Sequence, residues 1–248
     1  MERVSVRRGK NPLLFVAPHG PDDSNTDIIA EQAAESCDGY YVINRGFERK
    51  GDIVDVDNDR ANCNRIDHVV QEVVKEEFLD PITKFAEQMK NKIWSGSGQY
   101  YVDPTQICKP VIFYVHGAGD HVHSQVGEDV SIIIGYGLSH KNESLSCEEW
   151  RRKLFVHSYR SMTVDGEVYE GQGGGNYGGR SANNMNQYFR KHDSDMLIDS
   201  MQLEFPYSTR STESIATMTG VLLATVAQDI LNHDPSNPLS INPKQKFI

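Results

Sequence analysis

The feature that most constrains the fold is a short apolar run, residues 13–17, that is soon followed by a histidine and two aspartates. The run is continuous and bounded by prolines, which is typical of a strand buried on both faces of a sheet. His19 and Asp22 come next, separated by a Gly-Pro turn. Because imidazole nitrogens and carboxylate oxygens are the usual ligands of catalytic zinc, both side chains could bind one ion at the end of this strand. The neighbouring Asp23 is an alternative ligand, and the two-residue gap favours Asp22.

The rest of the chain alternates between predicted strands and predicted helices. Further strands are predicted at 40–44, 111–115, 130–134 and within 196–205. Helices are predicted at 24–36, at 66–94 with an interruption at Pro81, and at 146–157, 181–192 and 211–231. This alternation predicts an α/β fold in which a mainly parallel, mixed sheet is covered by helices on both faces. We expect a single α/β hydrolase-type domain over residues 1–248.

Local patterns add detail to this outline. Ser146 and Glu149 have the spacing of a capping box at the start of a helix. Residues 163–168 predict a small hairpin, and the polar segment 45–60 is expected to be an exposed excursion that returns toward the strand end. The glycine-rich stretch 171–179 lacks the lysine of a phosphate-binding loop, so we expect a mobile or lid-like loop there.

The composition excludes several classes of partner. The chain of 248 residues carries a formal net charge of −10, so nucleic-acid backbones and anionic membranes would repel it, and a small substrate is expected instead. Its four cysteines (Cys37, Cys63, Cys108 and Cys147) form no CxxC pair, so neither a zinc knuckle nor a disulfide framework is indicated. No window approaches eighteen consecutive apolar residues, and no signal-peptide core follows the N-terminus. We therefore expect a cytoplasmic protein.

Polar groups follow or end three of the apolar runs: His19 with Asp22, His116, and Glu204. Two histidines and one carboxylate form the ligand set that zinc uses for Lewis-acid hydrolysis, and a further glutamate can act as general base. Glu204 fits that second role, because a glutamate buried at a strand end is costly without a function or a partner. The alternative for Glu204 is a carboxylate facing solvent on an edge strand. His121 and His123 could be ligands, residues that orient a ligand, or ordinary loop residues.

The order of several short motifs along most of the chain resembles the N-formylglutamate amidohydrolase family. The motifs are Pro18-His19-Gly20, Asp57 through Asn64-Arg65, His116-Gly117, Ile132-Ile133-Ile134-Gly135, Gly178-Gly179-Arg180 and Gln202-Leu203-Glu204. That family looks like a branch of the zinc-carboxypeptidase-like superfamily. The resemblance implies a zinc-carboxypeptidase-like fold, a zinc ion (Zn²⁺) on His19, Asp22 and His116, and Glu204 as the catalytic base. Asp22 departs from the glutamate usual in the peptidases, and Asn44-Arg45 is a second Asn-Arg pair.

Arginines beside a metal could bind a substrate carboxylate. An arginine fork binds carboxylates in a bidentate manner, so Arg65, oriented by Asn64, could select an acyl-amino acid or a peptide C-terminus. We expect Arg65 rather than Arg45 to face the metal, because its setting resembles the family's motif more closely. Arg180 is a further candidate for the carboxylate or the oxyanion, as are Arg45 and Arg60. Tyr177 resembles in its setting the mobile tyrosine of carboxypeptidases.

The sequence therefore predicts a zinc-dependent amidohydrolase that cleaves the amide bond of an N-acyl amino acid, with Glu204 as base. The alternatives are a carboxypeptidase-like or poly-γ-glutamyl peptide hydrolase, and a catalytically inactive binding protein of the same fold. A nucleotide-binding α/β protein is disfavoured, because His19-Gly20-Pro21 does not supply the required glycine fingerprint. The sequence leaves the oligomeric state open.

Overall fold

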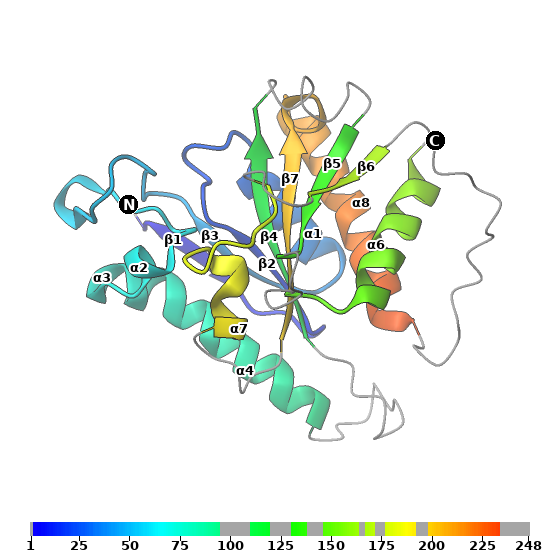
Figure 1. Cartoon of the computed structure of the whole chain (residues 1–248), viewed down its shortest axis with the longest axis horizontal. Helices are drawn as coiled ribbons and strands as arrows, with labels where there is room; N and C mark the ends of the chain where they lie inside the picture. Colours follow the sequence, from blue (N-terminus) through cyan, green and yellow to red (C-terminus); the bar gives the residue numbers. More distant parts are fainter. Residues whose placement is uncertain are drawn as a thin grey trace.

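A seven-stranded mixed sheet forms the centre of the molecule in the computed structural model (Figure 1). The structure describes residues 2–94, 110–119, 130–137, 146–163, 167–171, 177–191 and 198–233. The strands are β1 (Val4–Arg7), β2 (Leu13–Ala17), β3 (Tyr40–Asn44), β4 (Val111–Ala118), β5 (Val130–Gly135), β6 (Glu167–Glu170) and β7 (Asp199–Pro206). Their order is β1-β3-β2-β4-β7-β5-β6, and β3, β2, β4 and β7 run parallel. β1 is antiparallel to β3, and β5 is antiparallel to β7, so the predicted mainly parallel, mixed sheet is confirmed.

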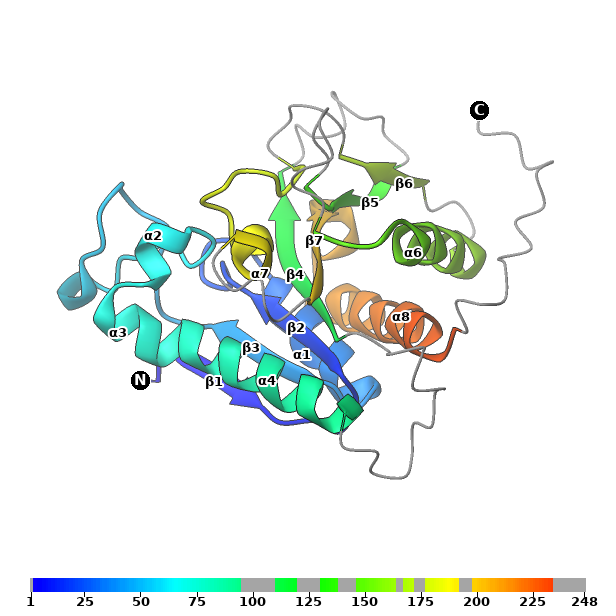
Figure 2. The same ribbon diagram turned by 60° about the horizontal axis from the view of Figure 1, so that its bottom comes forward.

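Helices cover both faces of the sheet (Figures 1 and 2). One face packs against α1 (Thr26–Ser36), α6 (Glu149–Met162) and α8 (Glu213–Asn232), and the other against α4 (Asp80–Trp94). The short helices α2 (Ile66–Val69), α3 (Glu72–Val74) and α7 (Tyr188–Lys191) lie on the α4 side. Every residue of β2 is buried, with alternate side chains in the two cores, as a strand between two helical layers requires.

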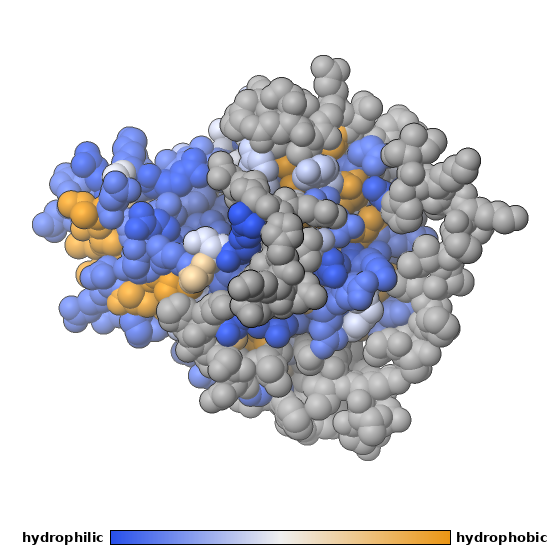
Figure 3. Space-filling model, in the orientation of Figure 1, coloured by the Kyte–Doolittle hydropathy of each residue, from blue (hydrophilic) through white to orange (hydrophobic). Residues whose placement is uncertain are grey.

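α8 is the one helix among the described residues that is long and apolar enough to cross a membrane. Its apolar face packs instead against α1 and α6, with Ala216, Leu223 and Ala227 buried in the core. Such burial is that of a core helix in a globular fold. The described part of the face seen in Figure 1 is mostly hydrophilic, with apolar areas toward the end where α2 and α3 lie and near β5 and β6 (Figure 3).

Some local predictions are wrong, and each failure has a physical reason. The Ser146 hydroxyl does not cap α6; it donates to the Ser200 carbonyl at 2.8 Å, and Glu148 precedes the helix without a side-chain cap. The turn of the hairpin predicted at 163–168, residues 164–166, lies outside the described residues, and residues 167 and 168 belong to β6, which pairs in parallel with β5. The polar helix expected at 181–192 is reduced to a 3₁₀ turn, Met185–Gln187, followed by α7, because Asn184 and its neighbours bond to other strands and loops.

The helical segment 66–94 breaks earlier than its proline suggests. α2 ends at Val69 and α3 at Val74, and a π-helical turn, Lys75–Leu79, then leads into α4. Pro81 is the second residue of α4. The π-helical turn runs directly into α4, so Pro81, which has no N–H to donate, lies where the hydrogen-bonding pattern changes between the two.

Candidate active site

Parallel strands bring three polar groups to one edge of the sheet. β2, β4 and β7 are parallel, so their carboxyl ends meet where His19 follows β2 and where His116 and Glu204 lie near the ends of their strands. His116 and Glu204 are directly opposite each other in the β4–β7 register. Because side chains alternate along a strand, both point to the face opposite the core that Val115, Leu203 and Phe205 fill.

The two histidines are buried and lie side by side. Their ring centroids are 5.2 Å apart, and each residue is 3% exposed. Burial lowers the pKa of His19 well below its ordinary value, with His116 and Arg49 adding to the effect. Burial likewise lowers the pKa of His116 to about 3, with Arg49 again contributing. His19 Nδ1 and His116 Nε2 are buried ring nitrogens that no described group hydrogen-bonds.

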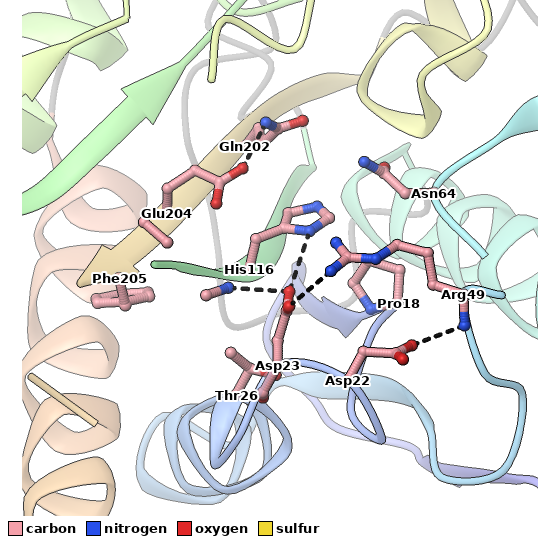
Figure 4. Close-up of polar contacts among 12 residues, drawn as sticks. Pro18, Asp22, Asp23, Thr26, Arg49, Asn64, His116, Gln202, Glu204 and Phe205 are labelled. Atoms are coloured by element: carbon pink, nitrogen blue, oxygen red, sulfur yellow. Dashed lines mark hydrogen bonds and ion pairs between the residues drawn. The ribbon is translucent and has the colours of Figure 1, made fainter. Parts of the chain in front are cut away.

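The structure separates the two adjacent aspartates (Figure 4). Asp22 Oδ2 accepts a hydrogen bond from the Arg49 backbone N–H at 2.8 Å, at the exposed end of the loop. Asp23 is 5% exposed; its Oδ2 accepts from the Gly117 N–H at 3.1 Å and lies 4.0 Å from His116 Nδ1. Burial raises the pKa of Asp23, although the Gly117 N–H and Arg49 oppose the shift. Asp23, rather than Asp22, is therefore the carboxylate that lies beside His116.

Glu204 is a buried carboxylate, 8% exposed. Its Oε1 accepts a hydrogen bond from Gln202 Nε2 at 2.8 Å. Burial, together with the charge of Asp23, raises the pKa of Glu204 to about 8, although the Gln202 hydrogen bond opposes the shift. A carboxyl group with a pKa near neutrality is suited to exchanging protons in a reaction.

Arg49 is the arginine whose guanidinium reaches this cluster from the 45–60 excursion (Figure 4). Its Nη2 lies 3.6 Å from Asp23 Oδ1, and half of the side chain is exposed. Arg65 instead bonds Asp67 in a fork, with Nη2–Oδ2 at 2.6 Å and Nε–Oδ1 at 3.1 Å, and Arg45 pairs with Asp27 and Glu31. The excursion thus returns to the strand end, and Arg49 is the cation it delivers.

The remaining predicted residues are divided between the site and its surroundings. Asn64 has a buried side-chain oxygen that no described group hydrogen-bonds, and it lies on the Arg49 side of the cluster (Figure 4). Tyr177 packs against Ala118 and Ile133. Burial raises the pKa of Tyr177, and the charge of Glu204 adds to that shift. The backbone of Arg60 pairs with that of Asp55, and Arg180 is half-buried; neither residue has a contact with the histidines among the described residues. His121 and His123 lie outside the described residues.

The described part of the glycine-rich stretch, Gly171 and residues 177–179, packs tightly on the sheet. A Cβ at Gly135 would lie 2.2 Å from the Tyr177 carbonyl oxygen, and Gly179 has a positive φ of 59°. A side chain at Gly179 would meet Asn186 Nδ2 at 2.7 Å. The loop backbone therefore depends on glycine at both contacts. Residues 172–176 of the predicted lid lie outside the described residues.

Arg210 connects three segments of the site through hydrogen bonds. Its guanidinium donates to three carbonyl oxygens: Phe205 at 3.0 Å, Ser24 at 2.8 Å and Ala118 at 3.0 Å. These carbonyls belong to the β7 end, the β2–α1 loop and the β4 end. A Cβ at Gly117 would lie 2.6 Å from the guanidinium carbon, so a side chain there would displace the Arg210 guanidinium. Arg210 thus fixes the relative position of the three segments that carry the candidate catalytic groups.

The residues present fit a metal ion in part. Within the described ranges, no three His, Cys, Asp or Glu side chains already stand as a ligand set for one ion. Two buried imidazole nitrogens without a hydrogen-bond partner, next to a buried carboxylate, nevertheless have the donor types that zinc binds. Such orphaned atoms are costly unless a ligand takes them up. His19, His116 and one of the two aspartates are the groups that could hold it.

Two residues of this site, Arg49 and Gln202, were not predicted from the sequence to be functional. Arg49 lies in a polar loop without periodicity, and only the fold shows where its side chain goes. Gln202 gave a usable signal, because it stands two residues before Glu204 on a strand and therefore shares its face.

Comparisons with known proteins agree with this fold. No family model matches the sequence, and no curated protein matches it either. Among solved structures, N-formylglutamate amidohydrolase from Ralstonia eutropha is similar with a TM-score of 0.55 at 11% identity, over 92% of this chain and 97% of that one. A gene product from Agrobacterium tumefaciens is similar with a TM-score of 0.55 at 13% identity, over 93% and 95% of the two chains.

A proposed carboxypeptidase from Burkholderia mallei is similar with a TM-score of 0.51 at 11% identity, over 92% of this chain and 59% of that one. At these identities the likeness concerns the fold. The fold expected from the order of the motifs is confirmed, because the chain shares its fold with N-formylglutamate amidohydrolase and with the Burkholderia mallei protein.

Proposed function

We propose that this protein is a zinc-dependent amidohydrolase that cleaves the amide bond of an N-acyl amino acid. The observation that carries the proposal is the meeting of His19, His116 and Glu204 at one sheet edge, with a buried unpaired nitrogen on each histidine. The fold shared with N-formylglutamate amidohydrolase supports the choice of substrate class. The zinc ion would be held by His19, His116 and an aspartate, for which Asp23 is better placed than Asp22.

The chemistry of the protein groups follows from their positions. A bound zinc ion would supply Lewis acidity toward the scissile carbonyl and toward water. Glu204 accepts a proton from the attacking water and then gives it to the leaving amine nitrogen as the C–N bond breaks. Arg49 offers a positive charge beside the reacting groups, and its partly exposed fork can bind a substrate carboxylate. The products are a carboxylic acid and an amino acid.

We expect Arg49→Ala to raise KM for substrates with a free carboxylate by about 10- to 100-fold, because one charge-assisted contact is lost. kcat should change little, since the contact is the same in the ground and transition states. The matched variant is Arg65→Ala, the residue favoured by the sequence, whose fork is occupied by Asp67. Steady-state kinetics of both variants decide: an unchanged KM for Arg49→Ala beside a large rise for Arg65→Ala would reverse the assignment.

The function itself is tested by metal analysis and a substrate panel. Purified protein is loaded with zinc and offered N-formyl, N-acetyl and longer N-acyl amino acids, a peptide with a free C-terminus and a poly-γ-glutamyl peptide. Release of amine from an N-acyl amino acid that stops on chelation supports the proposal. Turnover of only the peptides would favour the carboxypeptidase-like or poly-γ-glutamyl alternative. Zinc binding with no turnover of any substrate would favour an inactive binding protein.

A further inference from the structure

A chain of side-chain amides leads from the backbone of the α7 region to Glu204. Asn184 Nδ2 donates to Gln202 Oε1 at 2.9 Å, and Gln202 Nε2 donates to Glu204 Oε1 at 2.8 Å. Gln202 is 1% exposed, so water does not compete for its amide. Figure 4 shows the last bond of this chain, with Gln202 and Glu204 on the same face of β7.

The direction of this chain is fixed by a backbone group. Asn184 Oδ1 accepts a hydrogen bond from the Asn186 backbone N–H at 2.8 Å. A backbone N–H can only donate, so the Asn184 oxygen must face it and the Asn184 NH₂ must face Gln202. Gln202 must then accept with its oxygen and present its own NH₂ to Glu204. Flipping either amide would place two acceptors or two donors against each other.

The start of the chain is itself anchored. Asn186 Nδ2 donates to Ser146 Oγ at 2.9 Å, and Ser200 Oγ donates to the Asn186 carbonyl at 2.8 Å. The Asn184 backbone N–H donates to the Ser181 carbonyl at 2.9 Å. These bonds connect the segment to β7 and to the start of α6, so Asn184 cannot turn away without breaking several buried bonds.

We propose that Gln202, oriented by Asn184, is a positioning residue that fixes the carboxylate of Glu204 for proton transfer. The amide holds Oε1 and leaves Oε2 as the oxygen that exchanges the proton. This inference rests on the proposed function, because it takes Glu204 as the base. Without this role, Gln202 and Asn184 would serve only to satisfy hydrogen bonds in the buried core.

The test compares Gln202→Leu with a matched control, Gln187→Leu. Gln187 is also fully buried, but its amide donates to the Gly179 carbonyl at 2.8 Å instead of to Glu204. We expect Gln202→Leu to lower kcat by roughly 10- to 100-fold with KM unchanged, because a hydrogen bond to a charged group is lost. Asn184→Ala should give a smaller loss, and the double variant should lose less than the sum of both. Equal kcat losses for Gln202→Leu and Gln187→Leu would overturn the proposal.

A second readout does not depend on turnover. In ¹⁵N-labelled protein, the side-chain NH₂ signals of Gln202 should be protected from solvent exchange and should shift in Glu204→Gln, while those of Gln187 stay in place. Gln202 NH₂ signals that do not shift in Glu204→Gln would refute the proposal that Gln202 positions Glu204. If these signals behave as expected but no substrate on the panel is hydrolysed, the proposed function fails and the amide contact stands.

Discussion

Glu204→Gln should lower kcat by a factor of about 10² to 10⁴, the usual contribution of a general base. Glutamine keeps the shape of the side chain and removes its basicity. KM, zinc content and the free energy of unfolding should stay close to their original values, because Glu204 lies opposite His116 without being assigned as a ligand. Steady-state kinetics on the best N-acyl amino acid, together with metal analysis, measure these quantities.

The matched control for this experiment is Glu167→Gln, a carboxylate with a mostly exposed side chain on β6. It should leave kcat unchanged. Loss of zinc in Glu204→Gln would make Glu204 a ligand instead of a base. Full activity with zinc retained would remove Glu204 from the mechanism and leave the base unidentified.

Arg210→Met should destabilise the folded protein by about 3 to 5 kcal/mol, because it leaves several buried carbonyl groups without their charged donor. The carbonyls of Phe205, Ser24 and Ala118 all accept from this guanidinium, and Arg210 is 5% exposed. Activity should fall as well, because these carbonyls lie on the three segments that carry the site. Urea unfolding followed by circular dichroism gives the change in free energy.

Two further variants serve as comparisons for Arg210→Met. Arg210→Lys should recover only part of the stability, since an ammonium group cannot reproduce the planar fork. Arg8→Met, at an exposed arginine near the end of β1, should change the free energy of unfolding by less than about 0.5 kcal/mol. A loss below about 1 kcal/mol for Arg210→Met would show that water or rearranged side chains satisfy the carbonyls.

The sequence predicted the elements that one local pattern determines. Residues 13–17 and 111–115 are continuous apolar runs, and such runs form buried strands because nothing in them can face water. His19, His116 and Glu204 could be expected at one edge, since the carboxyl ends of parallel strands meet there. The structure brings these three side chains together.

The remaining features depend on contacts between distant residues. Which aspartate lies beside His116 depends on the Gly117 N–H, 94 residues away from Asp23 in the chain. Ser146 had the spacing of a helix cap, but the Ser200 carbonyl competes for its hydroxyl. Arg65 matched the family's motif, yet Asp67 binds its fork in this structure, and its predicted carboxylate-binding role stays a prediction. No local pattern contains such information.

The most direct test of the account is a crystal structure of zinc-loaded protein with anomalous diffraction measured at the zinc absorption edge. We expect one strong anomalous peak per chain, in contact with His19 and His116 and with a carboxylate from Asp23 or Asp22. The peak should be absent from His116→Ala crystals treated in the same way. No peak in the original protein, or a peak at other residues only, would contradict the proposed metal site and with it the mechanism built on Glu204.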